Sequence, residues 1–304
     1  MTAVAESMRV LLAGLVDYAG LFPPAQLDIG AAVRNFAGYR DGEHGWMLGR
    51  FIVPSARLDE FDGAAAAHLP RVRDAIPWLV SMLGGRDPVH DAEQVFAFNE
   101  RHAHTAAGRV VIDALEVKAA TPDEIASAVR SAPTGVTPYV EIPVSPDPTP
   151  LLAAIGAHGA RAKVRTGGVT PEAFPSSRDL ARFIHAAAQQ QVPFKATAGL
   201  HHPIRATYPL TYEPQPARGT MHGFLNVFLA AAFAAAGLGT GDLERLLDET
   251  DPRAFSIDEG GLAWRGSRAE LPALGTLRTR VATSFGSCSF TEPVEDLRTL
   301  GFLP

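Results

Sequence analysis

Two lysines in similar surroundings are the residues of this 304-residue sequence best suited to chemistry. Lys163 opens the segment KVRTGG and Lys195 opens the segment KATAG, each near the end of a short apolar run typical of a buried strand. If neighbouring strands turn both side chains inward, two ammonium groups approach each other. Their repulsion and burial then lower the pKa of one amine, which can attack a carbonyl group while neutral. This is the chemistry of a Schiff-base enzyme with an assisting lysine.

Further polar residues stand in or directly after the expected strands. A parallel strand covered on both faces is normally apolar, and an unpaired buried charge is costly, so these residues indicate a site. Residues that we expect to transfer protons are Asp113, Glu141, His201 and His202. Residues that we expect to bind substrate are Asp17, Arg165, Thr166, Gly167, Gly168 and Thr197. Arg165 supplies charge for an anionic substituent, and the Gly167–Gly168 backbone can present N–H groups to an anion.

The lysine segments resemble those of the class I aldolase superfamily, nearest to the deoxyribose-phosphate aldolase type. The resemblance covers residues 110–199 and implies that Lys163 forms the imine, that Lys195 lowers the pKa of Lys163, and that Asp113 shuttles protons. The sequence departs from the family where Arg165 replaces a small hydroxyl residue and where GLHH (199–202) replaces a pair of glycines that helps to hold phosphate. No Gly/Ser-rich phosphate loop follows the last expected strand, which argues against a phosphorylated sugar substrate.

Two other interpretations remain open at this point. His201, His202, Glu141 and Asp113 are residue types that bind a divalent metal in lyases and hydrolases, although no HExxH motif is present. A barrel without catalytic activity, used for binding, would keep both lysines paired with carboxylates and protonated. We expect no cofactor for the Schiff-base enzyme, because no nucleotide-binding motif occurs. Cys288, the single cysteine, is expected to be a buried structural thiol.

Alternating strand-like and helix-like segments must position these residues. The expected strands lie at 12–17, 48–53, 77–83, 110–119, 137–143, 161–166, 193–198 and near Phe255, and the expected helices lie at 58–69, 87–104, 122–130, 150–157, 177–190 and from about 221. Strand and helix alternating at this spacing imply right-handed connections and a parallel sheet. Eight such units predict a single-domain (β/α)8 TIM-type barrel over residues 1–304, interrupted by a long loop at 200–220.

The composition limits the classes of partner. The formal charge of −6 without a basic cluster argues against nucleic acid. One cysteine allows no internal disulfide, which fits a reducing compartment. The longest apolar stretch, 223–238, is shorter than the ~20 residues of a membrane span. We therefore expect a cytoplasmic enzyme with a small carbonyl substrate and no membrane partner. The apolar helix after Met221 buries either against the barrel or against a second subunit of a homo-oligomer.

Overall fold

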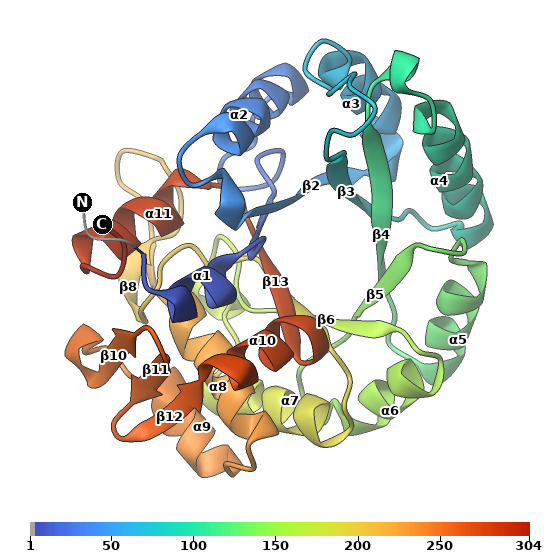
Figure 1. Ribbon diagram of the computed structural model, residues 1–304. Helices are drawn as coiled ribbons and strands as arrows, with labels where there is room; N and C mark the ends of the chain where they lie inside the picture. Colours follow the sequence, from blue (N-terminus) through green and yellow to red (C-terminus); the bar gives the residue numbers. More distant parts are fainter. Residues whose placement is uncertain (1–3) are drawn as a thin grey trace.

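Eight parallel strands close into a barrel in this computed structural model, which describes residues 4–304 (Figure 1). The barrel strands are β1 (Val16–Tyr18), β2 (Leu48–Pro54), β3 (Trp78–Leu83), β4 (Val110–Lys118), β5 (Thr137–Glu141), β6 (Arg161–Arg165), β7 (Phe194–Thr197) and β13 (Ala282–Ser287). Around the barrel they follow the order β1-β13-β7-β6-β5-β4-β3-β2. The predicted (β/α)8 fold is therefore confirmed.

Helices alternate with the strands and form the outer ring seen in Figure 1. They are α1 (Glu6–Leu12), α2 (Ile29–Asp41), α3 (Leu58–Ala65), α4 (Pro88–His102), α5 (Pro122–Ser131), α6 (Thr149–Ala157), α7 (Ser177–Gln189), α8 (Phe224–Ala235), α9 (Thr240–Leu247), α10 (Leu271–Arg280) and α11 (Thr291–Thr299). Polar side chains begin several of them: Thr121 Oγ1 accepts the backbone N–H of Glu124, and Glu124 Oε2 accepts the N–H of Ala120. This capping box fixes the start of α5 after β4.

The prediction of the eighth barrel strand near Phe255 is wrong. Phe255 begins β10 (Phe255–Asp258), which forms an antiparallel sheet outside the barrel with β11 (Gly261–Trp264) and β12 (Ser267–Glu270). The barrel is closed instead by β13, whose sequence ATSFGS lacks an apolar run because small and polar side chains face a crowded interior. The segment that was expected to complete the count of eight barrel strands therefore belongs to an outer sheet.

The long loop expected at 200–220 contains an antiparallel hairpin of β8 (Ala206–Pro209) and β9 (Arg218–Met221). Directly after it, α8 is buried along almost its whole length. Its side chains pack against α7, α9 and α10, and Phe224 stacks on Phe285 of β13. The apolar face of this helix is therefore covered within the chain. Among the described residues, no helix has both the length and the apolar character needed to cross a membrane.

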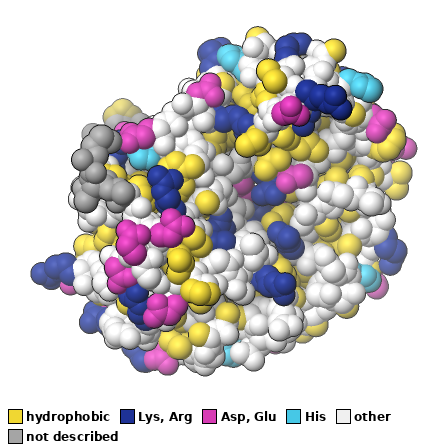
Figure 2. Space-filling model, in the orientation of Figure 1, with side chains coloured by type: hydrophobic (Ala, Val, Ile, Leu, Met, Phe, Trp, Pro, Cys, Tyr) yellow, Lys and Arg dark blue, Asp and Glu magenta, His cyan; other side chains and the backbone are white. Residues whose placement is uncertain are grey.

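The interior of the barrel is unusually polar. Most barrels of this type fill their interior with layers of branched apolar side chains. Here Arg50 on β2 forms a bidentate salt bridge with Asp113 on β4. The hydroxyl group of Tyr139 on β5 is hydrogen-bonded to both Arg161 and Thr283. Figure 2 shows charged side chains of both signs around the centre of the barrel on the face in view. The strands must therefore balance charges in order to pack together.

Replacing the buried Phe285 of β13 with alanine tests the corrected strand assignment. Phe285→Ala should lower the free energy of unfolding by about 3–5 kcal/mol, because it leaves a cavity beneath α8. Ile257→Ala in β10 should cost about half as much, because Ile257 is only half-buried. Urea unfolding of the two variants measures both values. A loss at Ile257 as large as that at Phe285 would contradict the assignment of β13 to the barrel.

Candidate functional site

Glu116 on β4 places its carboxylate between the two lysines. Lys163 and Lys195 lie opposite each other on β6 and β7, as the sequence predicted. Glu116 Oε2 is 2.7 Å from Lys163 Nζ, and Glu116 Oε1 is 2.7 Å from Lys195 Nζ. The expected direct repulsion between the lysines is therefore wrong for this geometry, because a shared carboxylate lies between them. Although burial opposes ionisation, the two ammonium groups hold the pKa of Glu116 well below its usual range.

A bulge in β4 explains how Glu116 reaches this position. Val80 of β3 lies opposite Ile112, but the next residue, Ser81, lies opposite Ala114, so Asp113 is an extra residue in β4. The bulge turns Asp113 to Arg50 and still directs Glu116 to the lysines, although simple alternation would place these two carboxylates on opposite faces.

Lys195 is held rigidly and sealed from solvent. Its Nζ donates hydrogen bonds to Asp17 Oδ2 at 2.6 Å and to Glu116 Oε1 at 2.7 Å, and the side chain is 1% exposed. Burial alone would lower the pKa of Lys195, but Asp17 and Glu116 outweigh it and raise the pKa. Asp17, which accepts a further bond from Ser284 Oγ, is itself fully buried. Asp17 was expected to bind substrate; it instead anchors Lys195 below the site.

Lys163 is held less tightly and borders a cavity. Its Nζ lies 2.7 Å from Glu116 Oε2 and 2.8 Å from Glu141 Oε2, but neither carboxylate oxygen has a directed hydrogen bond among the described residues. Lys163 and Glu116 both line a cavity of about 260 Å³. Of the two buried lysines, Lys163 is therefore the one that a small molecule can reach, and carboxylate oxygens of Glu116 and Glu141 lie beside its amine.

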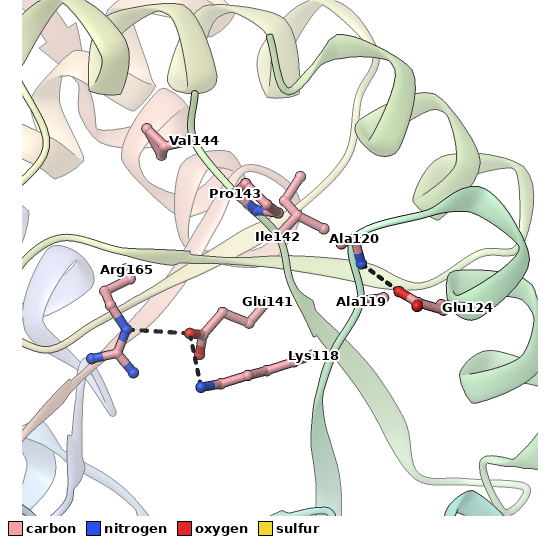
Figure 3. Close-up of a pocket in the computed structure, with 9 residues that line it drawn as sticks. All are labelled: Lys118, Ala119, Ala120, Glu124, Glu141, Ile142, Pro143, Val144 and Arg165. Carbon is pink, nitrogen blue, oxygen red and sulfur yellow. Dashed lines mark hydrogen bonds and ion pairs between the residues drawn. The ribbon is translucent and has the colours of Figure 1, made fainter. Parts of the chain in front are cut away.

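Glu141 is shared by three cations at the carboxyl ends of the strands. Figure 3 shows Arg165 and Lys118 approaching it from two sides, with Arg165 Nε 3.2 Å and Lys118 Nζ 3.8 Å from Glu141 Oε1. Burial raises the pKa of Glu141, but Lys163 and then Arg165 outweigh it and lower the pKa. The terminal nitrogens of Arg165 point away from Glu141 in Figure 3. They therefore lie on the side of the guanidinium away from the carboxylate that accepts the bond from Nε.

Asp113, expected to shuttle protons, is not brought to the lysines. Its two carboxylate oxygens accept bonds of 2.7 Å from Nε and Nη2 of Arg50. The pair lies nearer the amino end of β4 than Glu116. The geometry supports a structural pairing for Asp113 and places Glu116 where the shuttle was expected.

The remaining expected substrate-binding residues differ in their surroundings. Thr166 is fully buried and donates a hydrogen bond of 2.6 Å to the carbonyl of Ala198, so it ties the ends of β6 and β7 together. A Cβ on Gly167 would lie 2.9 Å from the Cα of Gly199, which shows how closely two loops approach there. Thr197 and Gly168, in contrast, both line the cavity that contains Lys163.

The two adjacent histidines face different partners. His201 lines the cavity of Lys163, and its Nδ1 lies 3.1 Å from Ser287 Oγ and 3.2 Å from Glu292 Oε2. His202 instead contacts Asp296 at 2.5 Å and stacks on Tyr208. The four residues of the metal interpretation, His201, His202, Glu141 and Asp113, thus have separate partners. Among residues 4–304, no group of three or more His, Cys, Asp or Glu side chains is arranged to hold a metal ion.

Sequence reasoning gave no role at the site to Glu116, Cys288 or Glu292. Glu116 carried a detectable signal, because it is a carboxylate inside a buried strand, but the bulge that directs it inward was not foreseen. Cys288 follows the unrecognised strand β13 directly and lines the cavity of Lys163. It is buried, as expected, but it lies 4.0 Å from His201 Nδ1 rather than in an apolar core. No protein-family model matches this sequence, and a search of curated proteins finds no significant match.

Replacing Glu116 with glutamine tests the shared carboxylate. Glu116→Gln should lower the free energy of unfolding at pH 7 by about 3 kcal/mol, because it removes the negative charge between two buried ammonium groups. Since the folded-state pKa of Glu116 is depressed, its contribution is complete above the unfolded value of about 4.3 and is lost as pH falls below it.

The difference between wild type and Glu116→Gln should therefore shrink as pH falls from 7 to 2 in urea-unfolding measurements. The exposed Glu93→Gln is the control, with a change near zero at every pH. A Glu116→Gln difference that stays constant across this range would show that the ion pairs do not stabilise the fold.

Proposed function

We propose that this barrel is a Schiff-base lyase that cleaves or forms a carbon–carbon bond in a small carbonyl compound, with Lys163 as the nucleophile. The observation that supports it is the difference between the two lysines. Lys195 is sealed from solvent by two hydrogen bonds and stays protonated, whereas Lys163, paired with Glu116 and Glu141, borders a cavity. A reactive amine needs access to substrate and a nearby proton acceptor, and Lys163 has both.

The chemistry balances within these residues. Lys163 passes a proton to Glu141, and its neutral amine adds to the substrate carbonyl; the same proton then returns to the hydroxyl group of the carbinolamine, which leaves as water. The resulting carbinolamine loses water to give a protonated imine. The imine draws the electron pair of the scissile carbon–carbon bond toward nitrogen while a base takes the proton of the substrate hydroxyl, so that the second fragment leaves as an aldehyde and an enamine remains on Lys163. Lys195 does not touch the substrate in this scheme; it keeps Glu116 ionised and in place.

The distribution of lysines in the whole chain supports the proposal. The sequence has 27 Lys and Arg residues, and only three of them, Lys118, Lys163 and Lys195, are lysines. All three lie on β4, β6 or β7 and beside Glu116 or Glu141. Arginine remains protonated in proteins and does not form an imine, whereas lysine can do so once neutral. The chain thus uses arginine where charge suffices and lysine at this site.

A binding barrel without catalysis is the second candidate, and one observation favours it. Both lysines are paired with carboxylates, so the network can serve as a charge-balanced core alone. The two candidates differ in what Lys163 does with a carbonyl compound: the lyase forms an imine that can be reduced, and the binding protein forms none.

Borohydride trapping is the direct test. The protein is incubated with acetaldehyde, acetone, pyruvate or benzaldehyde, reduced with sodium borohydride and analysed by intact and peptide mass spectrometry. We expect one adduct, on Lys163, because its amine is the one that borders the cavity. Lys163→Arg should abolish the adduct and retain the positive charge.

The matched control is Lys118→Arg, which replaces the exposed lysine at the mouth of the site and should leave the Lys163 adduct unchanged. An adduct on Lys195 would keep the reaction class but reverse the roles of the two lysines. No adduct with any of these carbonyls, or labelling of Lys118 alone, would favour the binding barrel.

A further inference from the structure

His201 stands where two cavities meet. The cavity of about 260 Å³ that contains Lys163 and a neighbouring cavity of about 510 Å³ share His201, Pro23, Gly168 and Ala198 in their walls. A molecule that occupies both cavities would therefore lie against this side chain. The position of Lys163 in only one of them makes the two cavities chemically different.

The imidazole of His201 is oriented by one of its nitrogens. Nδ1 faces Ser287 Oγ at 3.1 Å, Glu292 Oε2 at 3.2 Å and Cys288 Sγ at 4.0 Å, at the end of β13 and the start of α11. Nε2 has no hydrogen-bond partner among the described residues. It is also not completely buried. The ring is thus fixed on its Nδ1 side and leaves Nε2 open to the cavities.

The second cavity has a mostly apolar wall supplied by the hairpin of β8 and β9 and its turn. Pro209, Leu210, Pro216 and Met221 line it, and Tyr212 adds an aromatic ring. It is larger than the cavity of Lys163 and lacks a lysine in its wall. Its size and lining fit an apolar group, such as an aromatic ring, better than a second charged one.

We propose that the substrate spans both cavities, with its reacting carbonyl at Lys163 and a bulky, largely apolar aldehyde unit in the second cavity, and that His201 transfers the proton of the hydroxyl group between them. This rests on the proposed Schiff-base function. In bond formation, the enamine carbon attacks the aldehyde carbon, the aldehyde oxygen takes the proton from Nε2, and the imine is restored. In cleavage, neutral His201 takes that hydroxyl proton as the carbon–carbon bond breaks.

The surroundings of His201 suit a proton donor in the direction of bond formation. Burial would lower its pKa, but contacts with Cys288 and Glu292 outweigh burial and raise the pKa to about 9. The hydroxyl group of Tyr212 also contacts this cluster, at 3.0 Å from Glu292 and 3.7 Å from Cys288. The ring of His202, which is paired with Asp296, has its centroid 6.3 Å from that of His201. His201 therefore carries its proton at neutral pH and loses it as pH rises through about 9.

Separating the two half-reactions tests the role of His201. Imine and enamine formation is followed by deuterium exchange into the carbonyl compound that labels Lys163, and bond formation is followed with benzaldehyde as acceptor. His201→Asn keeps a hydrogen-bonding group at the Nδ1 side and removes Nε2. It should retain borohydride trapping and deuterium exchange within about threefold but slow bond formation about 10²–10⁴-fold.

The control is His158→Asn, at the exposed end of α6, which should leave both half-reactions within about threefold because His158 lines neither cavity. Full bond-forming activity in His201→Asn would overturn the inference and leave the Schiff-base function standing. Absence of trapping and exchange in the wild-type protein would instead remove the proposed function, and this inference with it.

Two further measurements exclude a merely structural role. The bond-forming rate of wild type should fall above about pH 9, and Glu292→Gln should move that fall to lower pH, because the neutral side chain no longer stabilises the imidazolium. Thr211→Phe narrows the second cavity and should reduce the use of benzaldehyde at least about tenfold more than that of acetaldehyde. Equal effects on the two aldehydes would overturn the two-cavity arrangement.

Discussion

The sharing of one buried carboxylate by two lysines is the interaction on which the rest of the site depends. Glu116 is almost fully removed from water, so its ionisation requires positive charge at contact distance. Lys163 and Lys195 provide that charge from two neighbouring strands, which fixes the register of β6 and β7 relative to β4. Small side chains leave room for this arrangement. Ser81 donates a hydrogen bond to Glu116, and most side chains of β13 are small.

This shared carboxylate gives its two lysines unequal freedom. On one side a second carboxylate, Asp17, completes a buried cluster in which Lys195 donates to both Asp17 and Glu116. On the other side Glu141 divides its charge among Lys163, Arg165 and the exposed Lys118, so the pairing is looser and open to the cavity. A site needs fixed parts to position its groups and less constrained parts to react, and a gradient of burial across one charge network supplies both.

The sequence predicted the barrel because most strands are followed by amphipathic helices at regular spacing, and it predicted that Lys163 and Lys195 would lie side by side. It misplaced the last strand, because β13 carries Ser and Gly where its neighbours bring charged side chains, and such a strand has no hydrophobic pattern to detect. It also chose Asp113 over Glu116. That error has a single cause, since one extra residue in β4 changes which carboxylate reaches the lysines, and a bulge leaves no reliable trace in composition.

Because the chain has only three lysines, few side-chain amines are available for chemical coupling. Reagents that couple to side-chain amines, such as succinimidyl dyes, cross-linkers and activated resins, find one well-exposed target, Lys118, whose side chain is 76% exposed and lines the pocket drawn in Figure 3. A support that captures the protein through that amine would cover the pocket that Lys118 shares with Glu141 and Arg165. Coupling through arginine side chains of the outer helices would leave this pocket uncovered.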